Sequence, residues 1–390
     1  MILRVNCIHF GICGGCLCET SPDGYRRPPL YQKELLQKEE RVRGLLGAYE
    51  VEEWRPMIPS PDEWGYRNKM ECAFGVWDER LVLGLRAAGR FDHVIDLETC
   101  GLMSPECLEA LKQVRAWANN HGFSGYHRRR HEGDLRYLVL REGKNTGQRM
   151  AILLMTGQGA QRCAPTPPMD LRPLLTTCWL GVTDDKGDVA RAEDMRLLWG
   201  PGTIEEKLGF ITYRISPYSF FQTNTRGTEK LYALLQDWSC DTRGALIDLY
   251  CGSGGISLAL ANSFDRVVGI DINKDAIEDA KKNAELNGIQ NAEFVGEDAQ
   301  EFLKKLPGSK LSVQLSAMVV DPPRVGLHPL ALRNLLEMNP PRLAYVSCNP
   351  ESLARDLQTL VPFYRIHSVQ PVDLFPHTAH VETLAFLEHR

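Results

Sequence analysis

Short apolar runs alternate with amphipathic stretches through the C-terminal part of the chain. Apolar runs of strand length recur from residue 245 onward, and two of them are followed by segments with helical spacing, 255–262 and 273–287. The expected strands are 245–249, 266–270, 292–295, 316–320, 342–346, 365–370 and 382–388. Strands that are apolar throughout and separated by helices predict an α/β fold with a mostly parallel, doubly wound sheet.

The N-terminal part has a different pattern. Residues 31–46 carry apolar side chains at helical spacing, and residues 105–121 form a second expected helix with Ser104 as its N-cap. Alternating residues predict strands within 66–96 and at 135–141 and 149–155, and a Gly-, Gln- and Pro-rich stretch at 158–169 predicts a loop. Strands mixed with a helix indicate an α+β domain.

These patterns divide the chain into four segments. The predicted boundaries are a cysteine-rich loop at 1–24, a helical segment at 25–57, a central α+β domain at 58–215 and the doubly wound domain at 216–390. A chain of 390 residues is long enough for two or three such units.

Composition narrows the functional classes. No apolar stretch reaches the length of a membrane span, and the N-terminus lacks a secretory hydrophobic region, so we expect a cytoplasmic protein without membrane contact. In a reducing compartment the 12 cysteines are expected to bind metal, catalyse or lie buried rather than form disulfides. The net charge of −5 means that any nucleic-acid surface must be a local patch.

The first C-terminal strand leads into a glycine-rich turn. Asp248-Leu-Tyr250-Cys-Gly252-Ser-Gly254-Gly opens a helix, where glycines let a ligand approach the backbone. Asp271 ends the next strand and Asp298 follows the third, so a carboxylate is available for a ribose and another for an adenine amino group. A dinucleotide would also suit such a site, but the spacing is not Gly-x-Gly-x-x-Gly. The pattern resembles that of S-adenosylmethionine-dependent methyltransferases.

Two further loops carry candidate chemistry. Asp321-Pro-Pro-Arg324 and Ser347-Cys348-Asn-Pro each follow an apolar strand, at the sheet edge where α/β proteins bind ligands. A lone cysteine after a strand is more often a buried side chain, but the flanking motifs make Cys348 a candidate nucleophile.

Four separated motifs resemble the uracil-5-methyltransferases of RNA: Ser219–Asn224, Asp321–Arg324, Ser347–Pro350 and His380–Thr383. The resemblance covers nearly the whole chain, and within the family it is strongest to the cluster-containing 23S ribosomal RNA enzymes. It implies a Rossmann-like class I methyltransferase domain at 216–390. The cofactor residues that it implies, with the glycines of the turn, are Gln222, Tyr250, Gly252, Gly254, Asp271, Asp298 and Asp321.

The resemblance also implies a reaction. Cys348 adds to carbon 6 of uracil, carbon 5 is methylated, and Glu382 removes the carbon 5 proton before the thiolate leaves. Asp321 would hold the uracil edge or position the nucleophile. Arg324 would contact a ring oxygen or phosphate, and Phe220 would stack on a base. Cytosine-5 enzymes use similar chemistry, but their Pro-Cys or Thr-Cys context is absent here.

The expected target is a uridine of 23S ribosomal RNA, and the alternative is the T-loop uridine of transfer RNA. A third hypothesis, from a different class, is a non-catalytic RNA-binding or ribosome-assembly factor that retains the fold. Nothing in the residues separates the two RNA targets. We expect a monomer.

Cysteines crowd the N-terminus as Cys7, Cys13 and Cys16. Three thiolates need a fourth ligand, and the resemblance assigns Cys100, although Cys18 and Cys107 lie near the same places. Four thiolates hold either a [4Fe–4S] cluster or a zinc ion, and the spacing alone does not decide. The resemblance implies the iron–sulfur cluster.

The strongest basic run is Arg128, Arg129 and Arg130, flanked by two histidines and preceded by Tyr126. Such a run is typical of a solvated surface or of phosphate contacts. Related enzymes carry an N-terminal oligonucleotide-binding barrel, the TRAM domain. Because the cysteine loop begins at residue 7, we expect that barrel to be absent and RNA to be held by the central domain.

Overall fold

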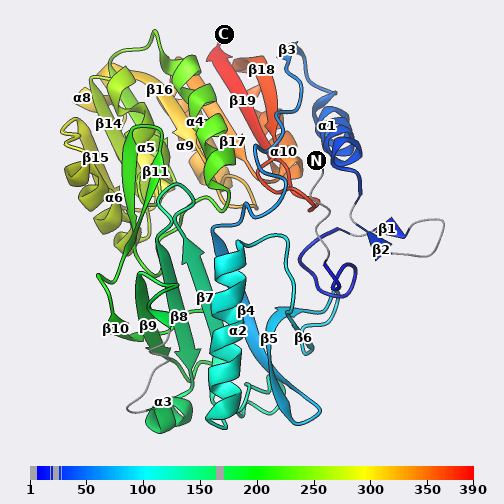
Figure 1. Cartoon of the computed structure of the whole chain (residues 1–390). Coiled ribbons are helices and arrows are strands. Elements are labelled where there is room, and N and C mark those ends of the chain that lie inside the picture. The colour runs from blue at the N-terminus through cyan, green and yellow to red at the C-terminus, as the bar shows by residue number, and fades with distance from the viewer. Residues whose placement is uncertain (1–6, 18, 21–25, 28, 164–170) are drawn as a thin grey trace.

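The computed structural model describes residues 7–17, 19–20, 26–27, 29–163 and 171–390. Two large sheets lie one above the other in Figure 1, an eight-stranded sheet with helices on both faces and a seven-stranded sheet with one long helix. In this described part of the chain, no helix combines the length and the apolar character that crossing a bilayer requires.

The eight-stranded sheet is mostly parallel, as the apolar pattern predicts. Its order is β15-β14-β13-β16-β17-β19-β18-β3. The bounds are β15 (Ala292–Gly296), β14 (Arg266–Asp271), β13 (Ala245–Leu249), β16 (Leu315–Val320), β17 (Arg342–Ser347), β19 (Glu382–His389), β18 (Tyr364–Val372) and β3 (Val51–Trp54). All neighbours from β15 to β17 are parallel, whereas β19 runs antiparallel to β17 and to β18.

Side chains of the central strands are buried on both faces of this sheet. Leu246 packs in the core under α4, α5 and α6, while Ile247 packs in the opposite core under α7, α9 and α10. The helix bounds are α4 (Thr225–Ser239), α5 (Gly255–Leu260), α6 (Lys274–Leu286), α7 (Ala299–Lys305), α9 (Pro329–Met338) and α10 (Pro350–Leu360), with a one-turn α8 (Lys310–Gln314) before β16. Burial on both faces explains why these strands read as continuous apolar runs.

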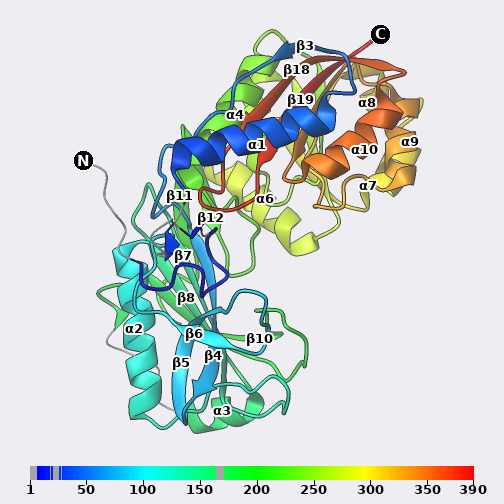
Figure 2. The same cartoon turned by 90° about the vertical axis from the view of Figure 1, so that its right-hand side faces the viewer.

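Residues 31–54 belong to the eight-stranded sheet in space. Helix α1 (Tyr31–Leu46) has the predicted bounds and lies along α10 and the sheet edge (Figure 2). Its Val42 and Leu46 are fully buried in the same core as Ile247. Strand β3, which the pattern does not predict, pairs in parallel with β18.

The lower sheet of Figure 1 has the order β10-β9-β8-β7-β4-β5-β6. Its strands are β4 (Lys69–Trp77), β5 (Arg80–Arg86), β6 (Val94–Asp96), β7 (Leu135–Glu142), β8 (Arg149–Met155), β9 (Thr177–Val182) and β10 (Asp194–Trp199). Helix α2 (Pro105–Asn120) covers one face and is capped by the Ser104 hydroxyl, which accepts a hydrogen bond from the Cys107 amide. The predicted strands and this N-cap are confirmed.

One local prediction is wrong. Residues 158–163 were expected in a loop, but they lie in helix α3 (Gly157–Cys163); residues 164–170 lie outside the described part. Few apolar side chains mark this short helix, so its hydrophobic pattern is weak.

Two small two-stranded sheets complete the fold of the described residues. The hairpin of β11 (Ile204–Leu208) and β12 (Ile211–Ile215) contacts α4 and α6. The two-residue strands β1 (Glu19–Thr20) and β2 (Arg26–Arg27) pair with each other.

Candidate active site

The predicted functional residues meet at the carboxyl edge of the eight-stranded sheet. Tyr250 follows β13, Asp271 ends β14, Asp321 follows β16 and Cys348 follows β17. Because these strands are parallel neighbours, the loops that leave them project from one edge. The chain crosses from one side of β13 to the other between β15 and β16, which places a topological switch point beside Tyr250 and Asp321.

The glycine turn after β13 is bound to the next strand. The Gly252 amide donates to the Asp271 carboxylate at 3.0 Å. Gly252, Gly254 and the non-glycine Tyr250 all have left-handed backbone, with φ of 53°, 84° and 67°. A Cβ on Gly254 would lie 3.1 Å from the Phe294 ring. Strained backbone at Tyr250 is typical of ligand-binding turns, and close packing requires glycine at 254.

Tyr250 separates two cavities. The larger, about 650 Å³, is lined by Tyr250, Asp298 and residues of the loop that follows Asp321. Phe220, Gln222 and Asp321 line the smaller cavity on the other side of Tyr250, and the Gln222 amide contacts the Asp321 carboxylate at 3.4 Å. Five of the seven predicted cofactor residues therefore line these cavities or bind the glycine turn beside them.

A buried carboxylate that the resemblance did not assign lies beneath the glycine turn. Asp248 is fully buried and accepts a hydrogen bond from Ser257 at 2.5 Å, and burial raises its pKa to about 7. This hydrogen bond joins β13 to α5, the two elements on either side of the turn that carries Gly252.

Cys348 and Glu382 come together through the antiparallel pairing of β17 with β19. Ser347 pairs with Thr383, so the next position on each strand brings Cys348 beside Glu382. Burial raises the pKa of the Cys348 thiol to about 11, and the Glu382 and Asp321 carboxylates add to the increase, while Arg324 opposes it. The Cys348 thiol therefore interacts electrostatically with both carboxyl groups.

Glu382 and Asp321 are a pair of desolvated carboxyl groups. Glu382 is 2% exposed, and burial together with Asp321 raises its pKa well above the ordinary value. The pKa of Asp321 is raised to about 7, first by desolvation and then by Asp248. Carboxyl groups with raised pKa values are stronger proton acceptors near neutral pH than ordinary ones.

Cationic and aromatic side chains lie on the loops around Cys348 and the glycine turn. Arg324 is exposed and contacts His380 at 3.4 Å, and its carbonyl accepts a hydrogen bond from Asn349 at 2.9 Å. Phe220 is 62% exposed beside the glycine turn, where the Ser253 hydroxyl donates to its carbonyl at 2.9 Å. The motifs at 219–224, 321–324 and 347–350 are thus adjacent in space.

A buried ionic cluster that sequence reasoning missed supports the segment before Glu382. Lys38 on α1 binds Asp373 at 2.9 Å and Glu34 at 2.6 Å, and Tyr31 donates to Asp373 at 2.8 Å. The carbonyl of His377 in the same segment accepts a hydrogen bond from Leu17 of the cysteine loop at 2.6 Å. Helix α1 and the cysteine loop therefore both fix the approach to β19.

The four predicted cysteine ligands gather between the two sheets. Burial raises the pKa of Cys16, and Cys100, Cys13 and Cys7 raise it further. The Cys7 thiol contacts the Thr99 carbonyl at 3.7 Å, next to Cys100. Across the described residues, no three His, Cys, Asp or Glu side chains lie at metal-ligand spacing. The donor chemistry suits a cluster or zinc, because all four groups are thiols that interact electrostatically.

The alternative ligands differ in position. Cys107 is buried on α2 in the core under the lower sheet, and Cys18 lies outside the described residues, as does part of the predicted loop at 1–24. Among the described cysteines, Cys100 is partly exposed and interacts electrostatically with Cys7 and Cys13, whereas Cys107 is buried.

The basic run is largely paired with carboxylates. Arg128 contacts Asp188, Arg129 binds Asp92 at 2.6 Å, and Arg130 lies 3.8 Å from Glu132. The run lies on the lower sheet, in the loop before β7.

Comparisons with known proteins agree with this geometry. A family profile described as tRNA (Uracil-5-)-methyltransferase matches residues 187–390. An uncharacterized RNA methyltransferase of Caldanaerobacter subterraneus is 34% identical over 98% of this chain and 84% of its own length. Another, of Halalkalibacterium halodurans, is 36% identical over 99% of this chain and 83% of its own length.

A solved structure is also similar over most of its length. It is the Pyrococcus abyssi tRNA (uracil-54, C5)-methyltransferase in complex with S-adenosyl-L-homocysteine. The TM-score is 0.75 and the identity is 31%, with 92% of this chain and 83% of that chain covered.

Proposed function

Because this chain belongs to the RNA uracil-5-methyltransferase family and is an S-adenosylmethionine-dependent enzyme, we propose that it methylates carbon 5 of a uridine in 23S ribosomal RNA through a covalent bond between Cys348 and the uracil ring. The observation that carries the proposal is the pairing of β17 with β19, which sets a thiol beside a buried carboxyl group. Nucleophile and base are the two groups that this reaction needs.

The chain's own residues divide the work between them. Cys348 loses its proton to a neighbouring ionised carboxyl group, and its sulfur adds to carbon 6 of the ring, which makes carbon 5 electron-rich. S-Adenosylmethionine, when bound, supplies the methyl group. Glu382 accepts the proton from carbon 5, and the carbon–sulfur bond breaks to free Cys348. Asp321 holds the uracil edge, and Arg324 contacts a ring oxygen or a phosphate.

The cofactor residues in this proposal surround the glycine turn. Gln222, Tyr250 and Asp321 would contact the donor on one side of the turn, and Asp298 on the other. Asp271 would accept ribose hydroxyls, with Gly252 and Gly254 providing room for the ligand at the backbone. The fit is supported by the two cavities that Tyr250 lines, of about 650 and 30 Å³.

The proposed RNA target is 23S ribosomal RNA, with the T-loop uridine of transfer RNA as the second candidate. The first is favoured by the four-cysteine set, because the resemblance to the cluster-containing 23S ribosomal RNA enzymes includes those cysteines. The second is favoured by the similarity to an archaeal enzyme that is named for uracil-54 of transfer RNA. The proposed central RNA-binding domain at 58–215 would hold either RNA.

The target is tested by mapping 5-methyluridine in RNA from a strain that lacks this protein. We expect mass spectrometry to show complete loss of the modification at one 23S position, restored by the wild-type gene and not by the Cys348→Ala gene. Loss confined to transfer RNA would replace the first target with the second.

We also propose that Cys7, Cys13, Cys16 and Cys100 hold a [4Fe–4S] cluster. Anaerobically purified protein is expected to contain about four iron atoms per chain. Cys100→Ser should lose most of the iron, because one thiolate ligand is removed. Cys240→Ser, which changes an exposed cysteine remote from the set, should keep it. Stoichiometric zinc in place of iron would overturn the cluster assignment.

A further inference from the structure

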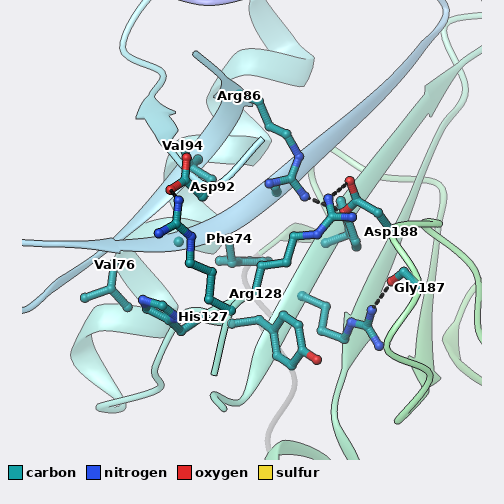
Figure 3. Close-up of a pocket in the computed structure, with 15 residues that line it drawn as sticks. Phe74, Val76, Arg86, Asp92, Val94, His127, Arg128, Gly187 and Asp188 are labelled. Carbon is teal, nitrogen blue, oxygen red and sulfur yellow. Dashed lines mark hydrogen bonds and ion pairs between the residues drawn. The ribbon is translucent and has the colours of Figure 1, made fainter. Parts of the chain in front are cut away.

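The lower sheet carries a further cavity, of about 250 Å³, on the face opposite α2. Figure 3 shows the residues that line it. Ala73, Val94 and Tyr137 line it and belong to a different core from Leu138, the neighbour of Tyr137 in the chain, which packs with the α2 side chains. None of the residues that we assign to catalysis or to the donor site lines this cavity.

Arginine dominates its lining. Four guanidinium groups, those of Arg86, Arg128, Arg129 and Arg136, face two carboxylates, Asp92 and Asp188. Arg136 is 3% exposed and donates to the carbonyls of Asp185 and Gly187. Within the described residues Arg136 forms no ion pair, and its Nε has no hydrogen-bond partner. The cavity therefore carries a surplus of positive charge, part of it buried.

Asp188 lies between two of these arginines, Arg86 and Arg128. Its Oδ1 lies 2.5 Å from Arg86 and accepts a hydrogen bond from the Tyr137 hydroxyl, and its Oδ2 contacts Arg128. Figure 3 shows the two guanidinium groups converging on the one carboxylate. Burial favours a higher pKa, but Tyr137 and the two arginines outweigh it and hold the pKa of Asp188 below its ordinary value. Two arginines and a hydroxyl directed at one anion also match the donor geometry for a phosphate.

An exposed aromatic ring lies at the edge of this arrangement. Phe91 is 55% exposed, and the guanidinium groups of Arg128 and Arg129 lie 5.3 Å and 5.8 Å from its ring centre. Proteins that bind single-stranded RNA combine phosphate-binding cations with an aromatic face for a base. A free phosphate would use only the cations.

We propose that this cavity binds a backbone phosphate of the RNA substrate between Arg86 and Arg128, and that Asp188 is an internal competitor displaced by that phosphate. The inference rests on the proposed function only in that the substrate is RNA. It assigns the cavity, rather than the whole basic run, as the point where the central domain holds the substrate.

The test measures binding of a labelled, uridine-rich single-stranded RNA by fluorescence anisotropy without S-adenosylmethionine. Asp188→Asn removes the competing charge and should tighten binding about three- to tenfold. Arg128→Gln should weaken binding about tenfold and lower the slope of log affinity against log salt by about one. Asp194→Asn, on exposed β10 outside the cavity, makes the same charge change and should have no effect.

Whether Asp188→Asn tightens or weakens RNA binding distinguishes a competitor of the phosphate from a purely structural residue. If Asp188 only joins two loops, its removal lowers the melting temperature and leaves RNA affinity unchanged or weaker, which would overturn the proposal. The gain in affinity from Asp188→Asn should be smaller in the Arg128→Gln background than in the wild-type background, because the phosphate that replaces the carboxylate has lost one of its two arginine partners. Additive effects would contradict a shared site.

A second arm separates RNA from free phosphate. Inorganic phosphate at millimolar concentration should raise the melting temperature of Asp188→Asn by little, since it lacks the neighbouring contacts of an RNA strand. Strong stabilisation by phosphate without any change in RNA affinity would make this a free-anion site and refute the RNA assignment. Because no methyl transfer is measured, failure of the Cys348 mechanism leaves these results unaffected.

Discussion

Cys348→Ala is expected to lower methyl transfer by on the order of 10⁴-fold or more, because no other group at this position can add to carbon 6 and leave again. The variant should also form no covalent adduct with RNA that carries 5-fluorouridine. In that substrate fluorine replaces the carbon 5 proton, so the wild-type adduct cannot release. Denaturing gel electrophoresis of enzyme with labelled RNA measures the adduct, and methyl transfer from labelled donor measures turnover.

The matched control is Cys240→Ala, which changes an exposed cysteine outside the site and should keep full activity. Binding of RNA by Cys348→Ala should stay within about twofold of wild type, since the thiol is small and partly exposed. An adduct that persists in Cys348→Ala would assign the nucleophile to another residue. Unchanged cellular function would favour the non-catalytic hypothesis.

Glu382→Gln is expected to trap the reaction one step later. Addition of Cys348 does not need the carboxylate, so the adduct with ordinary uridine RNA should form and accumulate. Removal of the carbon 5 proton does need it, so product release should fall by about 10²- to 10⁴-fold. A time course that separates adduct from released 5-methyluridine measures both steps.

The pH dependence of release tests the same assignment. Because burial raises the pKa of Glu382 well above its ordinary value, the group is protonated and unable to accept a proton at acidic pH. Release should therefore accelerate as the pH rises toward that pKa, and the Glu382→Gln profile should be flat. Glu388→Gln, on the same strand and paired with Arg365 at the surface, should retain the wild-type profile. Normal release by Glu382→Gln would exclude it as the base.

The Asp321 and Glu382 carboxyl groups also influence the protonation state of the site before substrate binds. Asp321 and Glu382 repel each other when both are charged, which favours protonation of one of them before substrate binds. Cys348, with a pKa of about 11, is then mostly a thiol. Ionisation of a neighbouring carboxyl group near neutral pH provides an acceptor for the thiol proton when the uracil ring arrives.

Local pattern predicted much of this fold. Strand β13 reads as an apolar run because Leu246 and Ile247 are buried on opposite faces, and α1 reads as a helix because Val42 and Leu46 share one buried face. The residues that follow these strands could be placed at one edge from the parallel order alone. Strand β3 could not be predicted from the local pattern, because its four residues are exposed or partly exposed and only its pairing with β18 makes it a strand.

By itself the sequence determined most of the elements, the parallel part of the sheet and the motif residues at the strand ends, and by resemblance it indicated the reaction. Side-chain periodicity and turn chemistry are local, so they can be read from neighbouring residues. Only the tertiary structure decided that antiparallel β19 sets Glu382 beside Cys348, that Lys38 on α1 supports the segment before it, and that Asp188 lies between Arg86 and Arg128. These contacts join residues far apart in the chain, and long-range strand pairing and burial, which no local pattern encodes, bring them together.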